Sequence, residues 1–202
     1  MTFYTISAPV DSQQKVRRST FRCFLFPISG VDEARRIVSA HAKEYSAATH
    51  NCFAYVCGFE REIQYSSDAG EPHGSAGKPI LNALLAADLT FVLAIVTRWF
   101  GGVKLGVPGL IEAYGSSVAL AVELAEKIPA VRQASFLVSA EYALVDQLTR
   151  LAGQLSGSVT GLRWSERAEL VLRVPAAESG RAAEFLDGFK QQSRLDYHLE
   201  EN

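Results

Sequence analysis

Two short glycine-rich segments hold most of the charged and aromatic residues that could do chemistry in this 202-residue chain. The first, residues 67–79, contributes four polar side chains, those of Asp68, Glu71, His73 and Lys78. The second, residues 98–109, contributes Arg98, Trp99, Phe100, Gly101, Gly102 and Lys104. Glycine takes backbone conformations that other residues avoid and lets another surface approach closely. Two such segments therefore indicate a shaped surface site.

The first segment offers the residue types of an acid/base group. A carboxylate beside an imidazole changes its protonation, so Asp68, Glu71 and His73 could act together. The same residue types also form turns and salt bridges in glycine-rich loops. No serine or cysteine has an evident base in the sequence, and no metal-binding triad is visible. We therefore expect binding rather than catalysis, with no metal and no cofactor.

The second segment suits an anion. The backbone amides of Gly101 and Gly102 and the charges of Arg98 and Lys104 could hold a phosphate-type group, and a helix beginning at Pro108 would point its amino terminus at it. The alternative is structural, with Arg98 paired to an acidic residue of the first segment, Asp68 or Glu71, as a clamp. The sequence leaves both interpretations open.

Particular residues exclude the familiar nucleotide motifs. A P-loop requires glycine six residues before its lysine and a hydroxyl residue after it, but Pro72 and Pro79 flank Lys78 at those positions. The glycines of the second segment also miss the spacing of the dinucleotide-binding motif.

The chain is close to neutral, with 20 Lys and Arg against 22 Asp and Glu and a net charge of -2. This balance argues against a protein that coats nucleic acid through many phosphate contacts. One dense basic stretch remains as a possible RNA patch, formed by Lys15, Arg17, Arg18 and Arg22. The alternative for this stretch is an edge strand that its charges protect from aggregation.

The odd number of cysteines, three, predicts reduced thiols rather than a disulfide framework. The first residues lack a signal peptide, and no apolar run approaches the length of a membrane span. We therefore expect a soluble, cytoplasmic protein with no membrane partner. The sequence leaves the oligomeric state open.

Hydrophobic periodicity indicates the elements that position the two segments. The first part of the chain predicts, in order, two strands around a tight turn, a helix, a strand, a helix, a strand covered on both faces and a second long helix, at residues 15–18, 21–26, 31–45, 51–59, 79–88, 89–96 and 108–125. A proline after the last helix and a change of pattern place a domain boundary there, giving domains 1–129 and 130–202.

The second domain predicts the order βαββαβ. Its strands and helices are expected at residues 131–140, 142–155, 159–164, 169–174, 176–189 and 195–199. This order matches the ferredoxin-like arrangement, a common fold that by itself says nothing about function.

The motifs in the first domain resemble those of the YigZ/IMPACT family. They occur in the family's order as Ser67 to Pro72, Gly74 to Pro79, Arg98 to Gly102, Lys104 to Leu110 and Ala113 to Gly115. Two further groups match family segments, His50, Cys52, Ala54 and Tyr55, and Arg18, Ser19 and Phe21. The resemblance covers the first domain, and the second domain resembles the one that follows it in bacterial members.

Some positions depart from the family pattern. Ala69 stands where an aspartate is usual, which weakens a two-carboxylate or metal role for the first segment. Ser75 replaces threonine and Trp99 replaces tyrosine. Val107 and Pro108 replace a Thr-Gly pair, and the proline removes an amide that an anion could have used.

The resemblance implies an α+β protein of two domains. The N-terminal domain would be a βαβ sheet-and-helix domain like domain IV of elongation factor G, and the C-terminal domain a ferredoxin-like one like its domain V. Eukaryotic relatives regulate translation under amino-acid starvation, a stress response, by competing for a ribosome-associated activator of a translation-factor kinase.

We therefore expect a non-enzymatic regulator of translation that binds the ribosome, structured RNA or a translation-associated protein. The two glycine-rich segments would form its recognition surface, with the basic stretch as the RNA patch. The alternative is a small hydrolase or transferase acting on a phosphorylated metabolite or nucleotide, with Asp68, Glu71 and His73 in acid/base roles and Arg98 and Lys104 on the phosphate.

Overall fold

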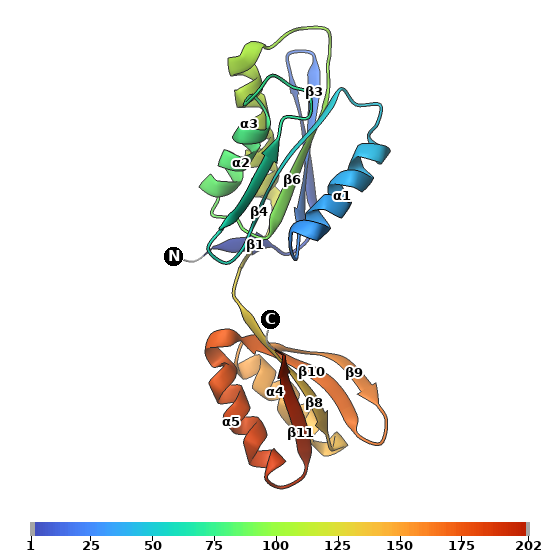
Figure 1. The fold of residues 1–202 in the computed structure, drawn as a ribbon, viewed down its shortest axis with the longest axis vertical. Coiled ribbons are helices and arrows are strands. Elements are labelled where there is room, and N and C mark those ends of the chain that lie inside the picture. The colour runs from blue at the N-terminus through green and yellow to red at the C-terminus, as the bar shows by residue number, and fades with distance from the viewer. Residues whose placement is uncertain (1–2, 201–202) are drawn as a thin grey trace. The chain divides into compact units, whose positions relative to one another are not determined.

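The computed structural model describes residues 3–200, which form two units, each with its own sheet and hydrophobic core. The first unit ends at Ala130 and the second begins at Val131. Figure 1 shows both units as sheets flanked by helices. The mixed α+β architecture expected from the sequence is confirmed.

A five-stranded antiparallel sheet forms the centre of the first unit, in the order β2-β3-β6-β4-β5. Its strands are β2 (Val10–Val16), β3 (Ser19–Pro27), β4 (His50–Cys57), β5 (Ile63–Ser67) and β6 (Val92–Trp99). A separate two-stranded sheet joins β1 (Tyr4–Ile6) to β7 (Lys127–Pro129). The sequence pattern predicts strands close to β3, β4 and β6. It is wrong for the strand expected at residues 15–18, since β2 ends at Val16 and residues 17–18 form the turn, and it does not indicate β1, β5 or β7.

Helices cover both faces of this sheet. α1 (Val31–Glu44) lies on one face, and α2 (Gly77–Ala86) and α3 (Gly106–Leu124) lie on the other. Alternate residues of β6 serve the two cores, since Leu93 and Ile95 join the α1 side while its even-numbered neighbours join the α2 and α3 side. A central strand covered on both faces needs apolar residues on both sides, which is why the continuous apolar run at residues 89–96 predicted a doubly buried strand.

The helix α3 corrects one expectation, because its 19 residues are long and apolar enough to cross a membrane. This is weak evidence for a span, since the core helix of a soluble domain has the same composition. Leu110, Tyr114 and Val118 on α3 are buried in the core that the helix shares with β2 and β3. One face of α3 is therefore used within the first unit, whereas Ile111, Leu120 and Leu124 on this helix are exposed.

The second unit has a four-stranded antiparallel sheet in the order β11-β8-β10-β9, which is the ferredoxin-like arrangement. Its elements are β8 (Gln133–Ala140), the short 3-10 turn Tyr142–Leu144, α4 (Val145–Gln154), β9 (Ser158–Trp164), β10 (Ala168–Pro175), the 3-10 turn Ala176–Glu178, α5 (Ser179–Lys190) and β11 (Leu195–Glu200). Along β10, Leu170 and Leu172 are buried while Glu169 and Arg173 are exposed, so α4 and α5 cover one face only. The predicted order βαββαβ is confirmed.

Candidate functional site

One end of the five-stranded sheet gathers the two glycine-rich segments. There β3 and β4 begin, while β5 and β6 end, because neighbouring strands are antiparallel (Figure 1). The first segment follows β5 and leads into α2, and the second follows β6 and leads into α3. Residues far apart in the sequence, such as Ser19, His50 and Arg98, therefore meet at this end.

A buried ion pair joins the two segments. An Nη1 group of Arg98 donates to Oε1 of Glu71 at 2.6 Å, and the two residues are only 5% and 8% exposed. The Arg98 Nη2 group also donates to the Ser19 hydroxyl at 3.2 Å. Of the interpretations that the sequence left open for Arg98, the geometry favours the clamp, and the partner is Glu71 rather than Asp68. Both residues lie beneath the surface that we expected them to form.

Tyr114 on α3 completes the surroundings of this ion pair. Its hydroxyl donates to the same Glu71 oxygen at 2.7 Å, and its ring meets the edge of the Phe21 ring at a centroid distance of 5.2 Å. Burial is the main cause that raises the pKa of Tyr114 well above its usual value, and the nearby Cys52 and Glu71 raise it further. The phenol therefore stays protonated and remains a donor to Glu71.

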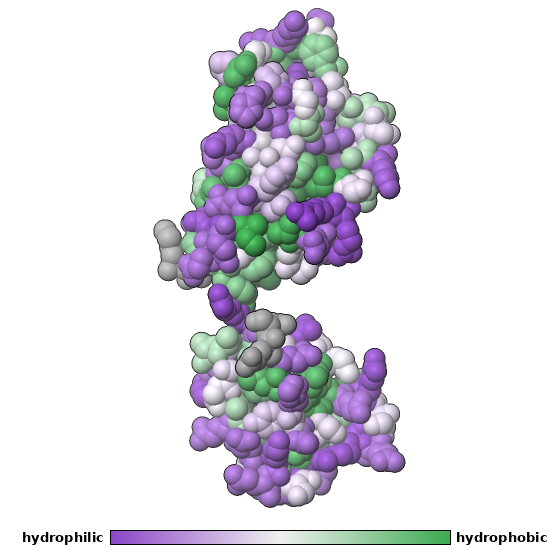
Figure 2. All heavy atoms as spheres, in the orientation of Figure 1, coloured by the Kyte–Doolittle hydropathy of each residue, from purple (hydrophilic) through white to green (hydrophobic). Residues whose placement is uncertain are grey.

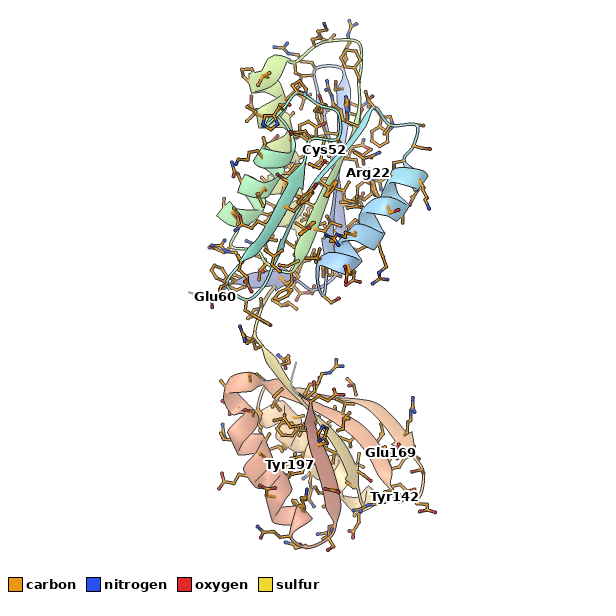
Figure 3. The ribbon with its side chains drawn as sticks, viewed as in Figure 1. Arg22, Cys52, Glu60, Tyr142, Glu169 and Tyr197 are labelled. Carbon is orange, nitrogen blue, oxygen red and sulfur yellow. The ribbon has the colours of Figure 1, made fainter. Side chains whose placement is uncertain are left out.

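The thiol of Cys52, a residue labelled in Figure 3, lies close to Tyr114 of this network. Its Sγ atom is 2.9 Å from the carbonyl oxygen of Asp68 and 3.4 Å from the hydroxyl of Tyr114. Burial raises the pKa of the Cys52 thiol to about 12. A thiol that stays protonated and buried is a poor nucleophile, so Cys52 acts here as a packed donor.

The carboxylate of Asp68 organises the first segment. Its Oδ1 accepts from the backbone amides of Ala76 and Gly77, at 3.1 and 2.9 Å, and its Oδ2 accepts from the amide of Gly74 at 2.8 Å. These bonds satisfy amides at the start of α2, which has no side-chain N-cap. Burial raises the pKa of Asp68, but the three amides outweigh it and the net shift is downward.

The turn that brings Glu71 back under Asp68 is strained. The amide of Glu71 donates to the Asp68 carbonyl at 3.0 Å, and the two central residues, Ala69 and Gly70, have φ values of 45° and 90°. Positive φ suits glycine but is unfavourable for alanine. The resemblance drawn from the sequence places aspartate at this position, and aspartate tolerates positive φ better than alanine.

The second segment packs against the turn between β2 and β3. A Cβ atom on Gly101 would overlap the backbone carbonyl of Arg18, so only glycine fits there. The Arg17 guanidinium donates to the carbonyl of Lys104 at 3.4 Å. The basic stretch and the second glycine-rich segment, which were separate features of the sequence, are therefore in contact.

The side chains around this buried network are exposed and form its rim. We define the rim as Arg17, Arg18, His73, Lys78, Phe100, Gly102 and Lys104, all of which are exposed. Phe100 is 45% exposed, and its ring lies 5.4 Å from the Arg98 guanidinium carbon. The accessible side chains of this end of the sheet therefore come from residues outside the buried ion pair, although Arg17 bonds the Lys104 carbonyl and the Phe100 ring contacts Arg98.

Other predicted site residues lie elsewhere. Trp99 follows Arg98 in β6 and so points to the opposite face of the sheet, where its ring is 6.2 Å from Tyr45. Arg22 lies on that same face, bonded to Asp11 at 2.7 Å and placed over the Phe24 ring. Lys15 is exposed on β2, opposite Thr20 of β3. The basic stretch is therefore divided between the rim and the α1 face.

Residues that the sequence had not assigned to the site also take part. Ser19 and Tyr114 bond the ion pair, and His50 places Nδ1 3.0 Å from the Ala69 carbonyl and Nε2 3.9 Å from Glu71. Ser19 and His50 belong to motifs that match the family, which was the signal available for them. Their contacts depend on strand pairing, which spacing alone does not give.

The geometry leaves little of the network available for acid/base chemistry. Asp68 accepts three amides, and Glu71 accepts from Arg98 and Tyr114. His73 is fully exposed, with Nδ1 3.7 Å from Asp68. Across residues 3–200, no three His, Cys, Asp or Glu side chains form a group that could hold a metal ion.

Known proteins resemble this chain in sequence and in fold. Residues 17–122 match a family model described as the Impact N-terminal domain. The IMPACT family member YvyE of Bacillus subtilis (strain 168) is 31% identical, over 92% of this chain and 85% of the relative. The IMPACT family member YigZ of Escherichia coli (strain K12) is also 31% identical, over 92% of this chain and 94% of the relative. A crystal structure described as that of a hypothetical protein has a TM-score of 0.68 and 28% identity, over 100% of this chain and 98% of the other.

Removing the charge of Glu71 should destabilise the first unit strongly. Glu71→Gln leaves the buried Arg98 without a counter-charge, and we expect a loss of about 3–5 kcal/mol in the free energy of unfolding. Urea denaturation, monitored by the fluorescence of Trp99, measures this loss. The experiment uses a Trp164→Phe background, which removes the tryptophan signal of the second unit. The exposed Glu112→Gln is the matched control, and equal losses in the two variants would contradict a structural ion pair. The double variant Glu71→Met/Arg98→Met should recover much of the loss, because no unpaired charge remains.

The stabilising effect of Asp68 should disappear in acid. Because its pKa is lower in the folded protein than its ordinary value of 3.8, the contribution is complete above that value and is lost as the pH falls through the folded pKa. The stability difference between wild type and Asp68→Asn should therefore be constant near neutral pH and shrink as the pH falls below 3.8. Urea titrations at a series of pH values measure this difference. If the stability difference between wild type and Asp68→Asn stays constant at acidic pH, the hydrogen bonds from the backbone amides do not depend on the negative charge of Asp68.

Relieving the strain at Ala69 should stabilise the first unit. Asparagine adopts positive φ more readily than alanine, so Ala69→Asn should raise the free energy of unfolding by about 1 kcal/mol. The control is Ala47→Asn, an exposed turn position without positive φ. Thermal unfolding of both variants, again followed by Trp99, gives the comparison. The same change at both positions would mean that the turn carries no strain.

Proposed function

Since this chain belongs to the IMPACT family, we propose that it is a non-enzymatic regulator of translation that binds RNA of the translation machinery through the rim at the end of the first unit's sheet. The family's resemblance to a translation-factor domain supports this class of function. Binding of a ribosomal or translation-associated protein through the same rim is the alternative outcome of the test below.

The contact between the β2–β3 turn and the second glycine-rich segment is the observation that carries the proposal. It gathers Arg17, Arg18 and Lys104 on the surface of a chain whose net charge is -2. A local group of cations in a nearly neutral protein suits a few phosphate contacts rather than general coating of nucleic acid. Phosphates of structured RNA, or a phosphate-type anion, would meet these three side chains.

Phe100 adds a second kind of contact to the rim. An exposed aromatic ring beside cations can stack on an unpaired base or anchor a protein interface. On the face of the first unit shown in Figure 2, hydrophobic residues lie in patches among hydrophilic ones. A polar and charged rim with one exposed ring fits RNA better than a large protein interface.

The buried network supports binding by fixing the rim. Glu71, Arg98 and Tyr114 hold both segments from below, so the exposed side chains project from loops of defined conformation. A surface that is already ordered loses less conformational entropy when it binds. The same engagement of Glu71 and Asp68 argues against the alternative of a hydrolase or transferase. We place this activity in the cytoplasm, where ribosomes are found.

The proposal predicts salt-dependent association with ribosomes through the rim. Wild-type protein should sediment with ribosomes at low salt and separate from them at high salt. The variant Arg17→Ala/Arg18→Ala/Lys104→Ala should bind more weakly, and its salt dependence should fall by about one counterion for each phosphate that it no longer touches.

The matched control removes three exposed cations from elsewhere, as Arg36→Ala/Lys43→Ala/Arg150→Ala, and should bind like wild type. Failure of the wild type to bind either ribosomes or free structured RNA would overturn RNA binding. Equal binding by the two triple variants would overturn the rim as the binding surface. Binding to salt-stripped ribosomal proteins without RNA would assign the rim to a protein partner.

A further inference from the structure

We propose that the groove between α1 and strands β4 and β5 is a stacking site for an unpaired nucleobase of single-stranded RNA. The groove lies on the α1 face of the first unit, whereas the buried network packs on the opposite face. It is enclosed by Arg35, Val38 and Ser39 of α1, Phe53 and Tyr55 of β4 and Tyr65 of β5. Its volume is about 310 Å³. The inference rests on the proposed function in assuming that the protein meets RNA.

Three aromatic rings form the floor of the groove. The Tyr65 ring is stacked beside the Tyr55 ring, with centroids 5.5 Å apart and planes 19° apart, and beside the Phe53 ring at 5.9 Å and 28°. Tyr55 pairs directly with Tyr65 across the two strands, so the rings share one face of the sheet. Tyr65 is 50% exposed although it is a large aromatic residue. Its free surface is available to a planar partner.

The polar groups of the groove suit a base and its phosphate. Tyr55 is only 6% exposed, and its side chain lines the groove. A tyrosine hydroxyl can donate a hydrogen bond to the edge of a base or accept one from it. Arg35 lies at the edge of the groove, and its side chain is 71% exposed. Its guanidinium is 3.7 Å from the Asp32 carboxylate, whose side chain is 96% exposed. An exposed pair of this kind contributes little, so the guanidinium is free to turn to a phosphate.

The same features disfavour other occupants. An organic cation in an aromatic cage would meet the positive charge of Arg35, so charge complementarity selects an anionic ligand instead. A base in a duplex is already stacked, whereas an unpaired base presents its face and its edge together. Because β5 is the edge strand of the sheet, the groove has an open side along which an RNA strand can continue. A proline-rich protein segment, which also docks on aromatic grooves, offers Arg35 only neutral carbonyl acceptors, whereas a phosphate offers a charged one.

The test compares single-stranded and paired RNA on matched variants. Fluorescence anisotropy with a labelled eight-nucleotide oligo(U) and with a labelled blunt-ended RNA duplex gives both affinities. Tyr65→Ala should weaken oligo(U) binding about tenfold or more, since stacking on one ring is removed, and leave duplex binding unchanged. Tyr65→Phe keeps the ring and should bind like wild type. Arg35→Ala should lower the salt dependence of oligo(U) binding by about one counterion, and its neighbour Arg36→Ala should not.

The outcomes separate this inference from the proposed function. If wild type sediments with ribosomes but Tyr65→Ala binds oligo(U) as well as wild type does, the groove is not a stacking site and the proposed function stands. If wild type binds oligo(U) through Tyr65 but no ribosomes or structured RNA, the groove stands without that function. Tyr65-dependent binding of an oligoproline peptide, with no binding of oligo(U), would assign the groove to a protein segment and overturn the inference.

Discussion

The buried ion pair between Glu71 and Arg98 is the interaction on which the site depends. Taking two charges out of water costs several kcal/mol for each, and only close pairing with further hydrogen bonds compensates for it. Tyr114 and Ser19 supply those bonds from α3 and β3, so four separate parts of the chain must be in place together. The pair is therefore better understood as a constraint on the arrangement of the loops than as a source of net stability.

This constraint separates the residues that build the site from those that can meet a partner. The interior uses the carboxylates, the tyrosine and one arginine. The rim side chains stay exposed, and their structural contacts include the hydrogen bond from Arg17 to the Lys104 carbonyl and the contact of the Phe100 ring with Arg98. Substitutions at the rim can therefore change recognition while the fold is kept. The stacked rings between α1 and the sheet are separate from both the ion pair and the rim, because they lie beside the smaller core on the other face of the sheet.

Sequence reasoning succeeded where a local pattern decides the structure. The apolar run in β6 and the alternation in β10 are set by burial, and the order βαββαβ follows from such patterns. It did not find β5, because an edge strand with Ile63 and Tyr65 exposed has no clear alternation. It also left open whether Asp68 or Glu71 pairs with Arg98. That choice depends on the positive φ of Ala69, which alanine as a residue type does not predict. Trp99 was grouped with Arg98 although successive residues of a strand point to opposite faces.

The small sheet formed by β1 and β7 has a consequence for synthesis of the chain. Tyr4 pairs with Pro129, and the amide of Ala130 bonds to the carbonyl of Phe3, so the first unit is closed by its two ends. A chain emerging from the ribosome cannot make these bonds until residue 130 has left the exit tunnel. The first unit can therefore be completed only when the second unit begins to emerge, and the second unit folds after it along the growing chain.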